Sequence, residues 1–217
     1  MELKIKDPGS ALTHFIAMLT AMVAATPLLI KAASVPGTMH LKALSVFIVS
    51  MILLYAASTV YHTFDISEHV NKILRKIDHM MIFILIAGTY TPVCLIVLGN
   101  KSGYRMLSLV WGIAIVGIII NALWINCPKW FSSVIYIAMG WVCIMAIRQI
   151  VAALTPAAFT WLLAGGIIYT IGGVIYALKL PLFNAKHQYF GSHEIFHVFV
   201  MAGSLCHYVT MFYIAKM

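Results

Sequence analysis

The chain has 217 residues, of which 63% are hydrophobic and only 9% are charged, and its mean hydropathy is +0.99. Soluble domains carry about 25% charged residues, so this composition excludes a soluble globular protein and indicates an integral membrane protein. The formal net charge is +8, but no basic run or aromatic platform accompanies it, which argues against nucleic acid as a partner. We expect the basic residues, which lie between apolar segments, to set the topology and to meet anionic lipid headgroups.

Apolar stretches long enough to cross a bilayer follow one another along the whole chain. A spanning helix needs about 20 mostly apolar residues. The stretches that meet this length are Ala11–Lys31, Leu41–His62, Asp78–Leu98, Tyr104–Trp124, Phe131–Ala152, Ala158–Leu178 and His193–Ile214. The connections between them are short and carry turn-forming residues, which leaves no room for a soluble domain. The sequence therefore predicts an all-α fold, with one seven-helix membrane domain over residues 1–217.

Prolines and glycines mark special positions inside these spans. Pro27 and Pro92 should kink their helices, which helix bundles in membranes tolerate. Glycine pairs at 165–166 and 172–173 recur at helical spacing in the sixth span. We expect them to let another helix approach closely.

The longest connection, residues 63–77, has a helical pattern of its own. Asp65 and Glu68 make a start that resembles a capping box. The apolar residues that follow fall on one helical stripe, with the basic residues elsewhere. This pattern favours a short helix that lies in the membrane interface, with its cations toward the headgroups. A plain solvated loop is the alternative.

The distribution of Lys and Arg gives an orientation. Eight of the 14 basic residues fall on the side of the N-terminus and six on the opposite side. This bias predicts a cytoplasmic N-terminus, and seven spans then place the C-terminus outside. The first span has no clear small-residue cleavage site, so we expect it to be retained as a helix and not removed as a signal peptide.

Two histidines, His193 and His197, stand four residues apart at the start of the last span. On a helix this spacing puts both imidazoles on one face, one turn apart, where they can share a metal ion. The same run spells H-E-x-x-H, a zinc-protease signature in which Glu194 would act as the general base. Which kind of metal site this is depends on the rest of the chain.

Alternating spans bring further polar residues to the level of this pair. The end of the second span, the start of the third and the start of the seventh face the same, cytoplasmic side. A catalytic zinc site has three protein ligands and keeps a fourth position for water. The sequence therefore predicts Zn²⁺ bound by His62, His193 and His197.

Asp78 and Ser58 lie at the same level and are the predicted catalytic residues. Zinc lowers the pKa of a bound water molecule to about 7, and Asp78 could hold or deprotonate this water. Ser58 lies one turn before His62 and could hydrogen-bond to that water or to a developing oxyanion. Ionisable residues within a span are costly and are functional candidates for that reason. The alternative is that such residues simply lie at headgroup level, where they cost little.

The remaining polar residues near this level receive other roles. His79 points about 100° away from Asp78 on the helix, so we expect a supporting or packing role. His207 lies about 21 Å along the helix from His193, on the far side of the bilayer, and should not join the site. His14, at the start of the first span, could support the ligands. Glu194 can face water or the basic loop at little cost, so we prefer Asp78 as the base.

Four sequence motifs together resemble the bacterial hemolysin III family, within the larger superfamily of progestin and adiponectin receptors. The motifs are A-S-T-V-Y-H at 57–62, D-H at 78–79 followed by A-G-T-Y-T-P at 87–92, Y-I-A-M-G-W at 136–141 and S-H-E-I-F-H at 192–197. The resemblance covers nearly the whole chain. The first helix departs from the family pattern at Ser10, where relatives often carry Asn.

The resemblance implies a multi-pass protein of the bacterial cell membrane, with seven helices and a cytoplasmic N-terminus. The family's zinc ligands fall on His62, His193 and His197, and its acidic and hydroxyl residues fall on Asp78 and Ser58. The wider group includes ceramide-cleaving enzymes, so the implied chemistry is hydrolysis of a lipid amide.

Three functions remain open on the sequence. The first is a zinc-dependent hydrolase of lipid amides or esters that acts in bacterial membrane homeostasis, with membrane lipids as its partners. The second is a non-enzymatic sensor or receptor with a structural zinc that joins the second and seventh helices. The third is a lytic, hemolytic membrane protein. A catalytic site should keep an open water position beside a lipid-accessible cavity, whereas a structural site should be closed.

Overall fold

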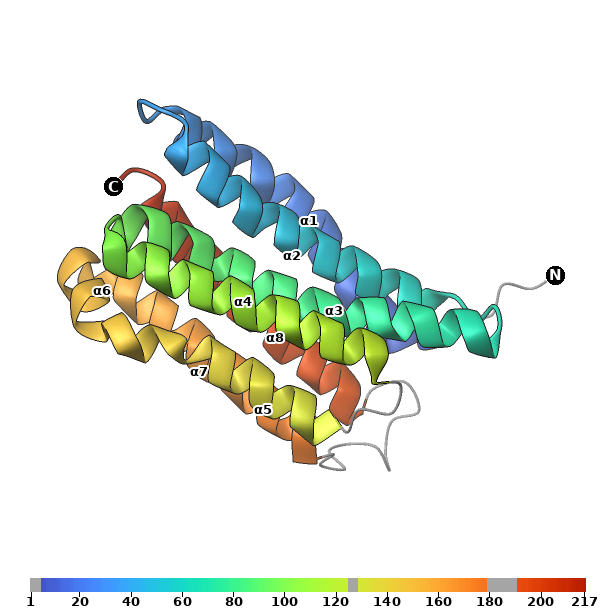
Figure 1. Cartoon of the computed structure of the whole chain (residues 1–217). Coiled ribbons are helices and arrows are strands. Elements are labelled where there is room, and N and C mark those ends of the chain that lie inside the picture. Colours follow the sequence, from blue (N-terminus) through green and yellow to red (C-terminus); the bar gives the residue numbers. More distant parts are fainter. Residues whose placement is uncertain (1–4, 125–128, 179–190) are drawn as a thin grey trace.

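The computed structural model describes residues 5–124, 129–178 and 191–217, and short turns and loops join the helices of this part of the chain (Figure 1). Its α-helices and their bounds are α1 Pro8–Ala33, α2 Met39–Thr63, α3 Glu68–Pro92, α4 Lys101–Leu123, α5 Lys129–Gly140, α6 Ile147–Ala153, α7 Pro156–Leu178 and α8 Ser192–Ile214. Within the described ranges they supply seven apolar spans of membrane-crossing length, α5 and α6 sharing the fifth. The predicted all-α, seven-helix membrane fold is confirmed.

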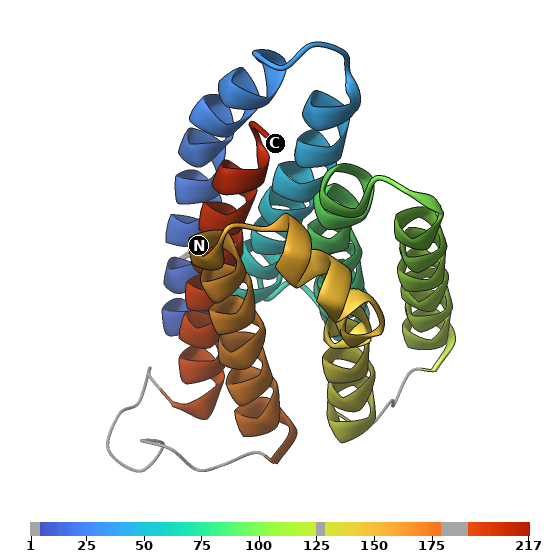
Figure 2. The same ribbon diagram turned by 90° about the vertical axis from the view of Figure 1, so that its left-hand side faces the viewer.

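The long helices run side by side, and the two ends of the chain lie at opposite ends of the bundle (Figure 1). The view turned by 90° shows a ring of helices that closes where α8 contacts α1 (Figure 2). The helices of this ring are α1, α2, α3, α5, α7 and α8. Helix α4 lies outside this ring and packs mainly on α3. Large apolar side chains such as Val23, Leu123 and Leu205 remain exposed on the bundle, as expected for a surface that faces lipid tails.

The separate interfacial helix predicted for residues 63–77 is wrong in its boundaries, because α3 runs without a break from Glu68 into the third span. No Gly or Pro interrupts the sequence there, so nothing ends the helix before the membrane segment. The residue that caps the N-terminus of α3 also differs from the one expected. Ser67, and not Asp65, accepts the hydrogen bond from the Val70 N–H, at 3.3 Å.

The fifth span is broken, whereas the sequence predicted one helix over Phe131–Ala152. Helix α5 ends at Gly140, a 3₁₀ segment covers Val142–Ala146, and α6 continues from there. The Tyr90 hydroxyl bridges the break: it donates to the Gly140 carbonyl at 2.6 Å and accepts from the Cys143 N–H at 2.9 Å. A side chain of α3 thus satisfies backbone groups that a continuous helix would pair internally, which makes the break tolerable inside a membrane.

The two prolines behave differently. Pro27 lies inside α1, which continues as a single helix to Ala33. At Pro92 the α-helix changes to a π-helix over Val93–Leu98, which Gly99 ends with a left-handed φ of 55°. Pro92 has no N–H to donate, so a change in the hydrogen-bonding pattern at this point is expected.

The predicted close approach at the glycine pairs is confirmed on the face of α7 toward α8. A Cβ added at Gly165 would lie 2.8 Å from Nε2 of His207, and one at Gly172 would lie 2.8 Å from Cβ of Phe199. On another face, a Cβ at Gly173 would meet Ile137 of α5 at 3.3 Å. The absence of side chains at these positions therefore brings α7 against both neighbours.

The orientation of the bundle in the membrane stays a prediction that a fusion experiment can test. We expect a reporter that is active only in the cytoplasm to stay silent when it is fused after Met217, because seven spans and the Lys and Arg bias place this end outside. The same reporter fused before Met1 should be active. An active C-terminal fusion would show that the orientation or the number of spans is wrong.

Candidate functional site

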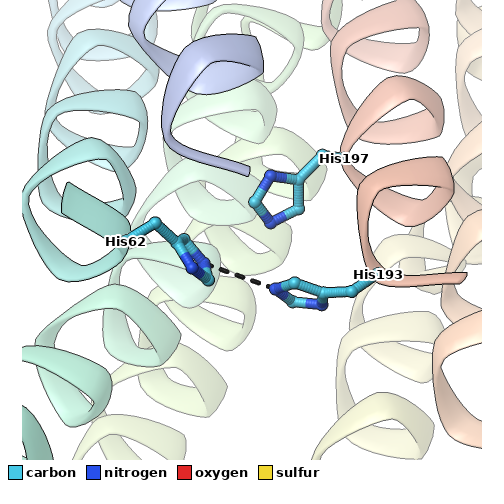
Figure 3. A group of neighbouring side chains, drawn as sticks. All are labelled: His62, His193 and His197. Atoms are coloured by element: carbon cyan, nitrogen blue, oxygen red, sulfur yellow. Dashed lines mark hydrogen bonds between the residues drawn. The ribbon is translucent and has the colours of Figure 1, made fainter. Parts of the chain in front are cut away.

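Three histidines from two helices converge at the end of the bundle where α1 begins. His62 lies in the last turn of α2, and His193 and His197 lie in the first turns of α8. One ring nitrogen from each lies within 4.8 Å of the others, and the rings point toward a common space (Figure 3). His62 and His197 are each only 2% exposed. The residues that the sequence predicted as ligands are thus together, in an arrangement that could hold a metal ion.

One pair of ring nitrogens lies at a distance that would suit two ligands of one zinc ion. Nε2 of His62 and Nε2 of His193 are 3.3 Å apart. Zn–N bonds of about 2.0–2.1 Å in a tetrahedron place two ligand nitrogens about 3.3 Å from each other. The same distance also suits a direct hydrogen bond between the two nitrogens. Such a bond would use a lone pair that a metal ion needs, so the two arrangements exclude each other. Three imidazoles on a tetrahedral metal would leave the fourth position free, as in catalytic zinc sites, whereas structural sites usually have a fourth protein ligand.

An aspartate near the N-terminus orients His62. Nδ1 of His62 donates a hydrogen bond to Oδ2 of Asp7 at 2.9 Å. This fixes the tautomer in which Nε2 carries the free lone pair, and it directs that atom toward the cluster. The backbone holds the pair in register, because the Asp7 N–H donates to the His62 carbonyl at 2.9 Å and the Lys6 N–H donates to the Thr63 carbonyl at 3.2 Å. The sequence reading missed Asp7, which precedes every predicted span.

We expect Asp7→Asn to lower the zinc affinity by about 10- to 100-fold, the usual loss when a carboxylate behind a ligating histidine is removed. The amide keeps the size of the side chain but loses the charge that holds the imidazole N–H. Competition with a chelator of known affinity measures the change. Asp65→Asn is the matched control, since Asp65 pairs with Asn71 at the exposed start of α3. Equal affinities for the two variants would contradict the role of Asp7.

Helix α1 supports His197 from two sides. Oγ1 of Thr13 lies 3.4 Å from Nδ1 of His197. The ring of His14 stacks on the ring of His197, with centroids 3.7 Å apart and planes only 6° from parallel. His14 is buried, and neither of its ring nitrogens has a hydrogen-bond partner among the described residues. The expected supporting position of His14 therefore becomes a direct contact with a candidate ligand.

Ser58 and Asp78 are both buried in the same region. Ser58 is 1% exposed, and its hydroxyl has no hydrogen-bond partner within the described ranges. Asp78 is 9% exposed, and its Oδ2 lies 3.3 Å from Nδ1 of His79. A buried hydroxyl without a partner is rare, and it is accounted for if Ser58 bonds to water or to a substrate.

His79 is not one of the three clustered histidines and has contacts that suit the supporting or packing role that we expected. Its Nε2 lies 3.1 Å from the Tyr176 hydroxyl of α7. Its backbone carbonyl accepts a hydrogen bond of 3.0 Å from the Tyr136 hydroxyl of α5. His79 therefore ties α3 to two other helices of the ring, next to Asp78.

Glu194 is engaged away from the histidine cluster. Its Oε1 accepts a hydrogen bond of 2.6 Å from the Ser10 hydroxyl, and its Oε2 accepts one of 2.8 Å from the Gly191 N–H. The second bond caps the N-terminus of α8, where a negative charge is favourable. We expected Glu194 to face water or the basic loop, and its hydrogen bond with Ser10 was not predicted. Ser10 is the position at which the first helix departs from the family pattern.

A cavity of about 190 Å³ extends from this site into the ring of helices. Ser58, Asp78, His193 and His197 line it at the end of the bundle where α1 begins, and mostly apolar side chains of α3, α5, α7 and α8 line the rest. His207 lies outside the ligand cluster, as predicted, yet it lines the same cavity. The prediction that His207 does not join the ligands is therefore confirmed, but the cavity that connects it to the site was not predicted.

Comparison with known proteins explains why these residues occur together. The sequence profile of a family described as Haemolysin-III related matches residues 3–208. The chain belongs to the haemolysin III family. Among its haemolysin III relatives, the chain is 35% identical to the Hemolysin-3 homolog of Bacillus subtilis (strain 168) over 212 residues, which cover 97% of this chain and 95% of the relative. It is 36% identical to Hemolysin-3 of Bacillus cereus over 210 residues, which cover 96% of this chain and 92% of the relative.

A more distant relative extends the similarity beyond haemolysin III. The chain is 26% identical to the Adiponectin receptor protein of Drosophila melanogaster over 180 residues, which cover 75% of this chain and 40% of that protein. This agrees with the wider superfamily that the motifs indicated. The family and the seven apolar spans together identify a multi-pass bacterial membrane protein.

Proposed function

We propose that the chain is a zinc-dependent hydrolase that cleaves an amide or ester bond of a membrane lipid and acts in bacterial membrane homeostasis. The observation that carries this proposal is the cavity, which joins two candidate ligands, His193 and His197, to Ser58 and Asp78 within a largely apolar wall. A lipid needs both parts of such a site: polar groups at the scissile bond and an apolar space for its chain.

Each group in the site has a role in this chemistry. His62, His193 and His197 would hold zinc, which would supply a Lewis acid and lower the pKa of a bound water molecule to about 7. Asp78 accepts the proton of the attacking water and later returns it to the leaving group. The Ser58 hydroxyl, which has no hydrogen-bond partner among the described residues, donates to the substrate carbonyl oxygen as negative charge develops there.

The surroundings strengthen these interactions. Ser58 is almost completely buried and Asp78 is nearly so, and the wall behind them is apolar. In such a water-poor space, a fixed hydroxyl and carboxylate act more strongly than they would in water, and they need no reorganisation during the reaction. His79 keeps the Asp78 carboxylate in place through its ring and through its bond to Tyr176.

Lipid analysis with purified protein tests the proposal. The protein is incubated with vesicles of a bacterial lipid extract, and the lipids are compared with those after incubation with Asp78→Asn. With the wild-type protein only, we expect the amount of one lipid class to fall and the amount of the fatty acid released from it to rise. Identical lipid profiles for the two proteins, with zinc present in both, would reject hydrolysis.

The second candidate function is a membrane sensor in which zinc clamps α2 to α8. The observation that favours it is the burial of His197, a residue that is 2% exposed and whose ring stacks on the ring of His14. A closed site of this kind is typical of structural zinc. If zinc is present, lipid profiles are identical, and zinc removal strongly lowers the melting temperature, the sensor is the better description.

A further inference from the structure

A second polar cluster lies deep in the bundle, away from the histidine ligands. It consists of Tyr55 on α2, Tyr169 on α7, and Ser204 and His207 on α8. The Tyr55 hydroxyl donates to Oγ of Ser204 at 2.6 Å, and the Tyr169 hydroxyl lies 2.7 Å from the same Oγ. The rings of Tyr169 and His207 stack, with centroids 5.3 Å apart. Tyr169 and His207 both line the cavity that begins at the candidate active site.

The hydroxyl groups of this cluster have one donor more than they use. Tyr55, Tyr169 and Ser204 carry three O–H groups, but only two hydrogen bonds join them. If Ser204 donates to Tyr169, the Tyr169 proton is left over, and if Tyr169 donates, the Ser204 proton is left over. In the described part of the chain, no further acceptor takes this proton. Of these three residues Tyr169 lines the cavity, so we infer that its O–H is the donor available to a ligand.

His207 adds a second group without a partner. It is only 7% exposed, and within the described ranges its Nδ1 has no hydrogen-bond partner. Gly165 makes room for the ring, because a Cβ there would lie 2.8 Å from Nε2 of His207. A histidine inside an apolar span is costly to bury, and packing alone would be served better by an apolar side chain.

Bonding between helices explains only part of the cluster. The two bonds to Ser204 connect α2, α7 and α8, which is a common use of hydroxyl groups in membrane bundles. That role needs neither the spare hydroxyl proton nor the imidazole. The spare hydroxyl proton, the Nδ1 of His207 and the cavity beside them point to an additional polar atom that comes from a ligand.

We propose that this deep cluster of Tyr55, Tyr169, Ser204 and His207 is a binding subsite for an uncharged oxygen, a hydroxyl or a carbonyl, on the aliphatic chain of an amphiphile in the cavity. His207 lies ten residues beyond His197 on α8, which is about 15 Å along a helix. This equals the depth of about one leaflet, half of a hydrocarbon core of about 30 Å. The aliphatic chain of an amphiphile whose polar head lies at the histidine ligands would therefore have its far end beside His207.

Binding of two simple probes tests this subsite. The probes are dodecanoic acid and its ω-hydroxy derivative, and their dissociation constants are measured by calorimetry with purified protein in detergent. We expect the ω-hydroxy acid to bind about three- to tenfold more tightly, the value of one added hydrogen bond. An apolar cavity would give the opposite order, because burying an unpaired hydroxyl is unfavourable.

Substitutions locate the preference. Tyr169→Phe keeps the ring and removes the hydroxyl, and His207→Leu removes the imidazole. In each variant, the dissociation constant of dodecanoic acid divided by that of the ω-hydroxy acid should fall to about one or below. Tyr208→Phe is the matched control, because its hydroxyl donates to the Ala24 carbonyl and Tyr208 does not line the cavity. Unchanged binding of dodecanoic acid shows that each variant is folded.

This inference rests on the lipid occupancy proposed above, and the outcomes separate the two. Equal binding of both acids to the unchanged protein, or a preference that survives in Tyr169→Phe and His207→Leu, rejects the deep subsite and leaves the hydrolase proposal in place. Failure of both acids to bind rejects occupancy of the cavity by an acyl chain, and the subsite with it.

Discussion

Replacing any one of His62, His193 and His197 by alanine should reduce the zinc content of the purified protein from about one ion per chain to nearly none. Each of these residues would supply one of three ligands, and two imidazoles on their own do not complete the site. We expect the affinity to fall by more than about 100-fold, since removal of a group that only supports a ligand already costs up to that much. Elemental analysis after dialysis against a weak chelator measures the change.

A histidine on the same helix provides the control for this experiment. His207→Ala removes a buried imidazole from α8 but leaves the three clustered nitrogens untouched, so its zinc content should equal that of the unchanged protein. Comparable zinc loss in His207→Ala would show that the assay reports a general loss of structure. Full zinc occupancy in all three alanine variants would reject the histidine cluster as the metal site.

The second large effect concerns the general base. We expect Asp78→Asn to keep its zinc and to lose lipid turnover by about 100-fold or more, because a positioned base contributes about 10²- to 10⁴-fold to a rate. Asn has the same shape but cannot accept the proton of the attacking water. Side-by-side measurements of metal content and of fatty acid release separate loss of metal from loss of catalysis.

Glu194→Gln is the matched variant, since it also replaces one carboxylate by an amide close to the ligands. It should keep its zinc and most of its turnover. In the structure, both Glu194 oxygens accept hydrogen bonds from groups outside the cluster, Oε1 from Ser10 and Oε2 from Gly191. If Glu194→Gln abolishes turnover while Asp78→Asn retains it, then Glu194 is the base, as in the zinc-protease signature.

The seven spans and the convergence of the histidines were predictable from the sequence for a simple physical reason. The length of each apolar stretch fixes where the chain crosses the membrane, and the alternation of spans then fixes which helix ends share a level. His62 at the end of one span and His193 at the start of another must therefore lie at similar depth. No knowledge of side-chain packing is needed for that conclusion.

Features that depend on contacts between distant residues were not predictable in this way. Nothing near Asp7 in the sequence indicates that it pairs with His62, because the pairing follows from backbone bonds between the N-terminal segment and the end of α2. The break at Gly140 depends likewise on the Tyr90 hydroxyl of another helix. Hydropathy reports only that such a segment is apolar, and it carries no information about which partner satisfies its backbone.

The contact between the first helix, α1, and the last, α8, has a consequence for biosynthesis. Asp7 and His62 enter the membrane with the first two helices, whereas His193 and His197 belong to the last one. Since a chain is made from its N-terminus onward, the histidine cluster cannot assemble until translation has reached α8 and this helix has inserted beside α1. A chain that stops before Ser192 carries a single one of the three ligands. If zinc binds there, only a chain whose last helix has been made and inserted could hold it with all three histidines.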